Sequence, residues 1–135
     1  MIISRETKYS KELLSAITTC GHATNAALLA DLHTLFPEVS ATTVHRATAR
    51  LLERGKIHEA PASKHGSMRY DANLTPHDHF VCTGCDGIRD IDIAGDFLPK
   101  ISSALGGCKI SGRLVVYGQC ERCVSKGVND ENNNL

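Results

Sequence analysis

The chain has 135 residues, 41% of them hydrophobic and only 4% aromatic, which suffices for one ordinary domain or two small ones with modest cores. Its formal net charge is zero, which argues against indiscriminate binding to nucleic acid. The first residues become charged at once, and no apolar run approaches membrane-spanning length. We therefore expect a cytoplasmic protein that does not enter a membrane.

The charge is unevenly spread along the chain. Residues 1–71 hold nine Lys and Arg against seven Asp and Glu, whereas residues 72–135 hold six against eight. Between Ala41 and Arg69 there are six basic residues and two acidic ones. This local excess suits contact with phosphate groups.

The first part of the chain is predicted to be helical. Residues 8–18 carry apolar side chains at helical spacing, and Gly21 is placed to end that helix. Thr24 is a good N-cap for a second helix, which cannot continue past Pro37.

A third helix begins after Ser40, its predicted N-cap, and ends at Gly55. Positions at helical spacing form one face of this helix and are predicted to be buried: Val44, Ala47, Thr48, Leu51 and Leu52.

The opposite face of the third helix is basic. Arg46, Arg50 and Arg54 recur every fourth residue, and Thr42 and Thr43 join them in the first turn. A helix can present such a face to the major groove of DNA, although a solvated surface is the commonest explanation of a charge stripe.

The segment after this helix favours the DNA-binding interpretation. Short strands are predicted at residues 56–60 and 67–71, joined by a turn that contains Lys64. Two helices, a basic helix and a basic hairpin, in that order, are typical of a winged helix-turn-helix.

The pattern changes after residues 72–76, a short polar connector that we take as a hinge. Beyond it we predict three strands, at residues 79–82, 87–93 and 109–119, and a helix over residues 96–105. The predicted fold class is α+β, with a winged helix-turn-helix domain over residues 1–71 and a small α/β domain over residues 77–123. Residues 124–135, rich in Asn and charge, are predicted to be disordered.

Four of the six cysteines form two pairs with two residues inside each pair: Cys82, Cys85, Cys120 and Cys123. Such pairs supply the four thiolates of a closed, structural zinc site. Disulfides or a redox-active pair are the alternatives, and a reducing compartment disfavours them. Cys20 and Cys108 have no partner at metal-binding spacing, and we predict partly buried free thiols.

Three segments bring a known family into view: Ser40–Arg46, His77–Cys85 and Tyr117–Cys123. Through them, residues 8–123 resemble the ferric-uptake-regulator family. The resemblance implies a homodimeric, metal-responsive repressor whose winged helix binds double-stranded, palindromic operators and whose second domain forms the dimer. His45 stands where relatives usually carry a tyrosine. The positions expected to contact DNA are Thr42, Thr43, His45, Arg46, Arg50 and Lys64.

The resemblance also implies a second, regulatory metal site with ligands from both domains: His22, Asp71, His77, His79 and Asp90. Three nitrogens and two carboxylates suit Fe(II) or Mn(II) better than a thiolate-preferring ion. Individually, a histidine at a helix start is more often a surface residue, and an aspartate at a strand end can simply end the hairpin. Bound metal would join the domains and favour the arrangement that binds DNA.

The two aspartates among these ligands bear on which signal the regulator would sense. Aspartate at both Asp71 and Asp90 is similar to the peroxide-sensing members, in which bound Fe(II) reacts with hydrogen peroxide and oxidises a histidine ligand. Here that histidine would be His22 or His77. A regulator that responds to iron or manganese availability needs the same ligands and remains the alternative.

No enzymatic activity is expected. A zinc deaminase would place a Glu two residues after its His and a proline before its cysteine pair, whereas His77 is followed by Asp78 and His79. The only small molecules expected are metal ions and hydrogen peroxide. A zinc-ribbon interaction module is a further alternative, which would bind one metal ion per chain instead of two.

Overall fold

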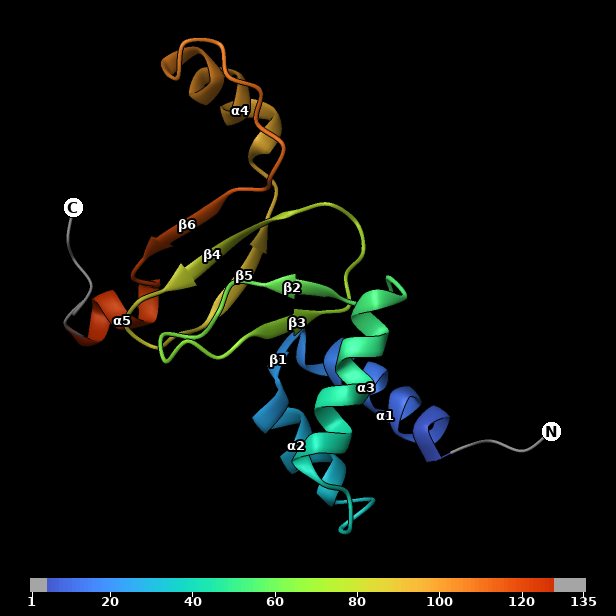
Figure 1. Cartoon of the computed structure of the whole chain (residues 1–135). Coiled ribbons are helices and arrows are strands. Elements are labelled where there is room, and N and C mark those ends of the chain that lie inside the picture. Colours follow the sequence, from blue (N-terminus) through green and yellow to red (C-terminus); the bar gives the residue numbers. More distant parts are fainter. Residues whose placement is uncertain (1–4, 128–135) are drawn as a thin grey trace. The chain divides into compact units, whose positions relative to one another are not determined.

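The computed structural model describes residues 5–127, and the chain divides into two compact units, Met1–Leu74 and Thr75–Leu135 (Figure 1). The first unit contains three helices and a small sheet, and the second contains a three-stranded sheet with two helices. The predicted α+β class, with a winged helix-turn-helix followed by a small α/β part, is confirmed. The use of residues 72–76 as a hinge stays a prediction.

The helices of the first unit are α1 (Arg5–Cys20), α2 (Asn25–His33) and α3 (Ala41–Glu53). Both predicted N-caps are present. The hydroxyl of Thr24 accepts the N–H of Ala27, and that of Ser40 accepts the N–H of Thr43. Helix α1 extends beyond the predicted residues 8–18 in both directions.

A three-stranded antiparallel sheet completes the first unit. It consists of β1 (His22–Thr24), β2 (His58–Ala60) and β3 (Arg69–Asp71), with β3 in the centre. The predicted hairpin strands are present but shorter than residues 56–60 and 67–71. Strand β1 was not predicted, because a three-residue strand is defined by its pairing with distant β3 and not by a local pattern.

Apolar side chains from all three helices and the sheet meet in the core of the first unit. The buried members are Tyr9, Leu13, Ile17, Ala23, Leu28, Leu32, Val39, Val44, Ala47, Leu51, Ile57 and Tyr70. The predicted inward face of α3 is largely confirmed, with Leu52 only half-buried. This core fixes α3 with its basic face outward.

The second unit is built on β4 (Asp78–Cys82), β5 (Ile88–Ile91) and β6 (Val115–Gly118). Central β4 pairs antiparallel with β5 and parallel with β6. Helix α4 (Ala94–Ala104) connects β5 to β6 and stands away from the three strands (Figure 1). Strand β6 covers only the end of the predicted 109–119 strand, because Gly112 and its neighbours form an irregular approach.

Helix α5 (Glu121–Lys126) begins directly after Cys120, contains Cys123 and ends at Gly127, whose φ of 66° is left-handed. The prediction that disorder begins at residue 124 is therefore wrong for the first residues of that segment. Residues 128–135 lie outside the described part of the chain. Among the helices described, we find none with the length and apolar character needed to cross a membrane.

Candidate metal centres and DNA-facing surface

The four paired cysteines converge at the end of the sheet of the second unit. Strand β4 ends at Cys82, and Cys120 and Cys123 lie at the start of α5. The Sγ atoms of Cys82 and Cys123 are 3.6 Å apart, and those of Cys85 and Cys120 are 3.9 Å apart. A tetrahedral zinc ion with Zn–S bonds of about 2.3 Å requires sulfur separations of about 3.8 Å. The cluster therefore fits a structural zinc ion.

The electrostatics of the cluster favour a cation. Burial raises the pKa of the Cys82 thiol, but N–H groups of the neighbouring backbone donate to its sulfur and bring the pKa down to about 6. Backbone donation by the Cys123 N–H likewise lowers the pKa of Cys120. Burial raises the pKa of Cys123 to about 12. Cys82 and Cys120 thus ionise more readily than an ordinary thiol, whereas Cys123 requires a nearby cation to ionise.

The turn that runs from Cys82 to Gly87, just past the first cysteine pair, brings the backbone close to sulfur. Asp86 adopts a left-handed φ of 64°, and its N–H donates to the carbonyl of Cys82. A Cβ atom at Gly87 would lie 3.3 Å from Cys85 Sγ, so a side chain there would crowd the cluster.

The other two cysteines do not join this site. Both Cys20 and Cys108 are exposed, so the prediction of partly buried thiols is wrong. Cys20 is the last residue of α1, and Cys108 lies in the loop after α4.

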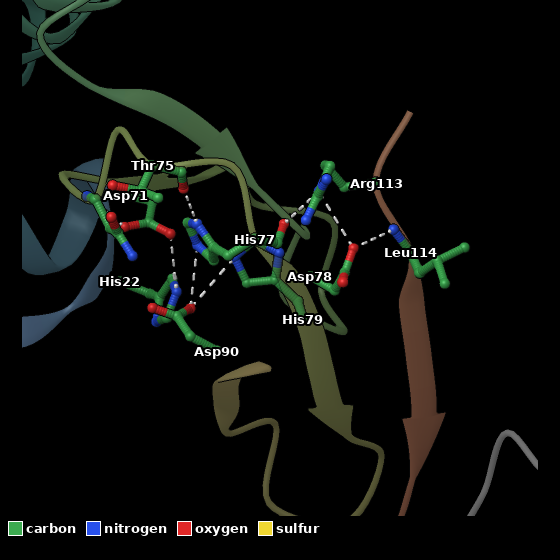
Figure 2. A network of polar contacts seen from close by, with 10 residues as sticks. His22, Asp71, Thr75, His77, Asp78, His79, Asp90, Arg113 and Leu114 are labelled. Carbon is green, nitrogen blue, oxygen red and sulfur yellow. Dashed lines mark hydrogen bonds and ion pairs between the residues drawn. The ribbon is translucent and has the colours of Figure 1, made fainter. Parts of the chain in front are cut away.

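His22 and Asp71 form one group of potential ligands within the first unit. They are opposite each other in the β1–β3 register, and His22 Nε2 lies 3.3 Å from Asp71 Oδ2 (Figure 2). The Asp71 side chain is almost fully buried, and its second oxygen accepts the N–H of Asn73. A buried carboxylate beside an imidazole offers an oxygen and a nitrogen ligand to a cation.

His77, His79 and Asp90 form a second group within the second unit. Asp90 Oδ1 lies 3.3 Å from His77 Nε2 and 3.5 Å from His79 Nε2 (Figure 2). His77 Nδ1 lies 2.6 Å from the carbonyl oxygen of Thr75. Because a carbonyl oxygen can only accept, Nδ1 carries the proton and donates this hydrogen bond. This bond leaves the lone pair of His77 on Nε2, the atom that faces Asp90.

Strand position explains how this second group forms. His79 and Asp90 are register partners across β4 and β5, so their side chains share one face of the sheet. His77 lies one residue before β4, and its ring centroid is 4.6 Å from that of His79. His77 and His79 therefore lie side by side and both face Asp90.

Asp78, between the two histidines, points the other way (Figure 2). Its fully buried carboxylate accepts the N–H groups of Ile93, Ala94 and Leu114 and lies 3.3 Å from Arg113 Nε. Burial by itself raises the pKa of Asp78, but the three backbone donors and Arg113 more than offset this and lower it. This residue therefore connects segments of the second unit as a structural anion.

The DNA-facing residues predicted on α3 occupy its outer surface. Thr42, His45, Arg46 and Arg50 are exposed, whereas Thr43 is half-buried and its hydroxyl contacts Ser40 at the helix start. Arg46 and Arg50 line a hollow of about 300 Å³ whose other side includes Tyr9 and Glu38. Lys64 is exposed in the loop between β2 and β3.

A polar network behind this surface was not predicted. Asn25 Nδ2 lies 3.1 Å from His45 Nδ1 and donates to the hydroxyl of Tyr70 at 3.2 Å, while Asn25 Oδ1 accepts the hydroxyl of Thr48 at 2.9 Å. Thr48 had been assigned to the apolar face by spacing alone. Two polar residues at inward positions, Asn25 and Thr48, were the available signal.

Comparisons with known proteins agree with these features. The profile of the Ferric uptake regulator family matches residues 4–102. The peroxide operon regulator of Bacillus subtilis is 29% identical over 112 residues, which cover 82% of this chain and 77% of that protein. The transcriptional regulator PerR of Clostridium acetobutylicum is 41% identical over 63 residues, 45% of this chain and 46% of the relative.

The fold also matches a solved structure. The Campylobacter jejuni peroxide stress regulator superposes with a TM-score of 0.69 at 22% identity, over 88% of this chain and 91% of that one. The matched profile spans more than half of the sequence and includes α3 and the first cysteine pair. The chain therefore belongs to the ferric uptake regulator family of metal-dependent transcription regulators.

Proposed function

We propose that the chain is a repressor that binds palindromic operator DNA through α3 and the β2–β3 hairpin, and that it does so only with a regulatory metal ion bound. The observation that carries the DNA contact is the geometry of α3. Its inner face is buried, so Arg46 and Arg50 are held outward on a fixed helix. Arginine on such a helix can donate two hydrogen bonds to guanine in the major groove.

The hairpin supports the same contact. Arg69 is buried at the start of β3 and donates to the carbonyl of Ala62, which fixes the loop from within. Lys64 is exposed in that loop. A lysine held there would contact phosphate and position α3 without reading sequence.

Apolar side chains on the second unit support a homodimer. Val115, Val116 and Tyr117 on edge strand β6, with Phe97 and Leu105 near α4, are exposed. A second copy would bury this surface, and its symmetry would set the separation of two α3 helices on a palindrome.

The regulatory ion would be held by both ligand groups together, His22 with Asp71 and His77 with His79 and Asp90. Each group already places nitrogen and oxygen atoms 3.3–3.5 Å apart. Neighbouring ligands on an octahedral ion lie about 3 Å apart for bonds of about 2.1 Å, so small movements within each group would fit its own ligands to an ion. Two or three ligands alone bind weakly, so occupancy would favour the arrangement that unites the groups. A change from mostly open to mostly closed requires about 5 kcal/mol of differential binding.

Peroxide is the proposed signal, and the names of the two curated relatives and the aspartates at both carboxylate positions support it. Bound Fe(II) would supply the electrons that activate hydrogen peroxide. His22 or His77, placed beside the ion, would take up one oxygen atom from the peroxide while the other leaves as water. The oxidised ring would bind the metal more weakly, so the metal and then the operator would be released.

The DNA contact is tested with a duplex selected from a random library by the Mn(II)-loaded protein. Arg46→Ala is expected to weaken binding by about tenfold to hundredfold, the loss of one bidentate base contact. Lys100→Ala on α4 is the matched control and is expected to bind as the unaltered protein does. Equal binding by Arg46→Ala, or no selected duplex at all, would refute the proposal.

The union of the ligand groups is tested by Mn(II) titration of zinc-loaded protein. His22→Ala and Asp90→Ala, one variant from each unit, are both expected to weaken the same single site, and exposed Asp92→Ala is expected to leave it unchanged. If only Asp90→Ala matters, the ion is held by the second unit alone.

The signal is tested by peptide mass analysis after brief exposure to hydrogen peroxide. Fe(II)-loaded protein is expected to gain one oxygen on the peptide with His22 or with His77, whereas Mn(II)-loaded protein is not. The peptide with exposed His58, which lies between Lys56 and Lys64, serves as an internal control. Intact histidines under Fe(II) would favour a regulator of metal availability.

A further inference from the structure

The network behind α3 joins three elements of the first unit. Asn25 is the first residue of α2, His45 and Thr48 lie on α3, and Tyr70 lies on β3. Thr48 and Tyr70 are buried, whereas His45 is exposed. The network therefore runs from the core to the outer surface of the helix, and Asn25 is its central member.

The side chain of Asn25 uses all its hydrogen-bonding groups. Its two N–H groups point to His45 Nδ1 and to the hydroxyl of Tyr70, and its oxygen accepts from Thr48. Because the Thr48 and Tyr70 groups are anchored in the core, the amide is fixed in place. The imidazole of His45 is therefore held at one of its two nitrogens by a fixed donor.

The consequence concerns the other nitrogen of His45. A neutral imidazole that accepts at Nδ1 carries its proton on Nε2. His45 directly precedes Arg46 on the helix that we assign to the major groove. Its Nε2–H would be a donor for groups that only some bases present there: guanine O6 and N7, adenine N7 or thymine O4.

We propose that Asn25 is a positioning residue for operator recognition, which holds His45 in one orientation and one tautomer so that Nε2–H reads a base edge. This inference rests on the proposed role of α3 in DNA binding. Its advantage is preorganisation, because a ring already fixed in the free protein loses less entropy on binding than a mobile side chain does.

The first experiment is a double-mutant cycle on the selected operator duplex with Mn(II)-loaded protein. Asn25→Ala and His45→Ala are each expected to weaken binding by about tenfold, the effect of one lost hydrogen bond with its orientation. The double variant is expected to bind no more weakly than His45→Ala alone, because Asn25 acts through His45. Arg46→Ala is measured alongside.

The outcomes separate the two proposals. If Arg46→Ala binds normally, the role of α3 fails and the inference fails with it. If Arg46→Ala is weak but Asn25→Ala is neutral, or adds fully to His45→Ala, the role of α3 stands and the positioning role of Asn25 is refuted. Single-base substitutions across the duplex add a second readout, since Asn25→Ala and His45→Ala should lose discrimination at the same base pair.

Asn25→Asp tests the tautomer and also covers the case in which Asn25→Ala does not fold. The aspartate keeps the size of the side chain and still accepts from Thr48, but it has no N–H for His45. The imidazole proton is then expected on Nδ1, which leaves Nε2 as an acceptor and shifts preference toward bases that present an amino group. Nitrogen NMR of labelled histidine, at a mildly alkaline pH where imidazole is ordinarily neutral, measures this directly. An unchanged His45 signal in Asn25→Asp would overturn the inference.

Discussion

Different interactions stabilise the two units of the molecule. Among its described residues, the first buries twelve apolar side chains around one core, contributed by all three helices, by β1 and β3 and by the segments beside them. In the second, the cluster of buried side chains among the described residues consists of three cysteines with Phe80 packed against them. The first unit is thus stabilised by apolar burial, and the second requires a metal ion at the centre of what would otherwise be a core.

This difference suits the two proposed tasks. A DNA-reading surface needs a rigid support, which the core under α3 provides. The second unit, which we propose to sense metal and to contact a second copy, has exposed apolar side chains on β6 and at α4. Variants that affect one unit and spare the other are therefore the sharpest tests.

The largest effect is expected from removing the zinc site. Cys123→Ser eliminates one ligand, and we expect zinc loss and unfolding of the second unit, because structural zinc contributes about 10 kcal/mol or more to such folds. Hydrogen exchange read separately for the two units measures this. Amides of β4 that stay protected without zinc would contradict the comparison, and Cys108→Ser is the control with an exposed thiol.

A cavity in the core of the first unit should destabilise that unit and spare the second. Leu13 is fully buried on α1, and Leu13→Ala is expected to destabilise the first unit by about 2–5 kcal/mol. Zinc content and the protection of the second unit should not change. Denaturant unfolding with both readouts tests this, and a parallel loss in both units would mean that they fold as one.

A smaller effect is expected at Asp78. Asp78→Asn replaces one carboxylate oxygen by an N–H donor that faces backbone donors, so we expect a loss of about 1–3 kcal/mol confined to the second unit. Retained zinc with faster exchange at the Leu114 amide would be the signature. A variant as stable as the original would show that the metal alone holds this unit.

The smallest effect concerns a surface ion pair beside the zinc site. Arg89 Nη2 donates to Glu121 Oε1 at 2.6 Å, and this bond lowers the pKa of Glu121 to about 2. Both groups are exposed, so Arg89→Ala is expected to change the melting temperature little, and any change should vanish in high salt. Zinc loss from this variant would reveal a role for the pair in holding α5.

Features that depend on residues close together in the sequence, such as helix caps and paired cysteines, were predictable from the sequence. Thr24 and Ser40 cap their helices as expected, and the spacing of the cysteines predicted their cluster. Features that depend on distant partners were not. Strand β1 exists through pairing with β3, and the loop before β6 is longer than alternation suggested.

The polar network shows the same limit at the level of one side chain. Helical spacing placed Thr48 on the buried face correctly, but spacing does not report what a buried hydroxyl contacts. Its partner Asn25 is 23 positions earlier in the chain, so the pair becomes visible only when α2 packs on α3. Similarly, the exposure of Cys20 depends on where α1 ends, not on its neighbours in sequence.

The position of the two cysteine pairs also determines how the second unit would survive a break in its chain. One pair precedes β5 and the other follows β6, so a bound zinc ion would clip together the two ends of the long excursion that includes α4. A protease that cut the exposed loop at residues 106–109 would then leave two fragments still attached through the metal. A chelator would then separate them, because we expect the pairing of β4 with β6 to be lost together with the metal.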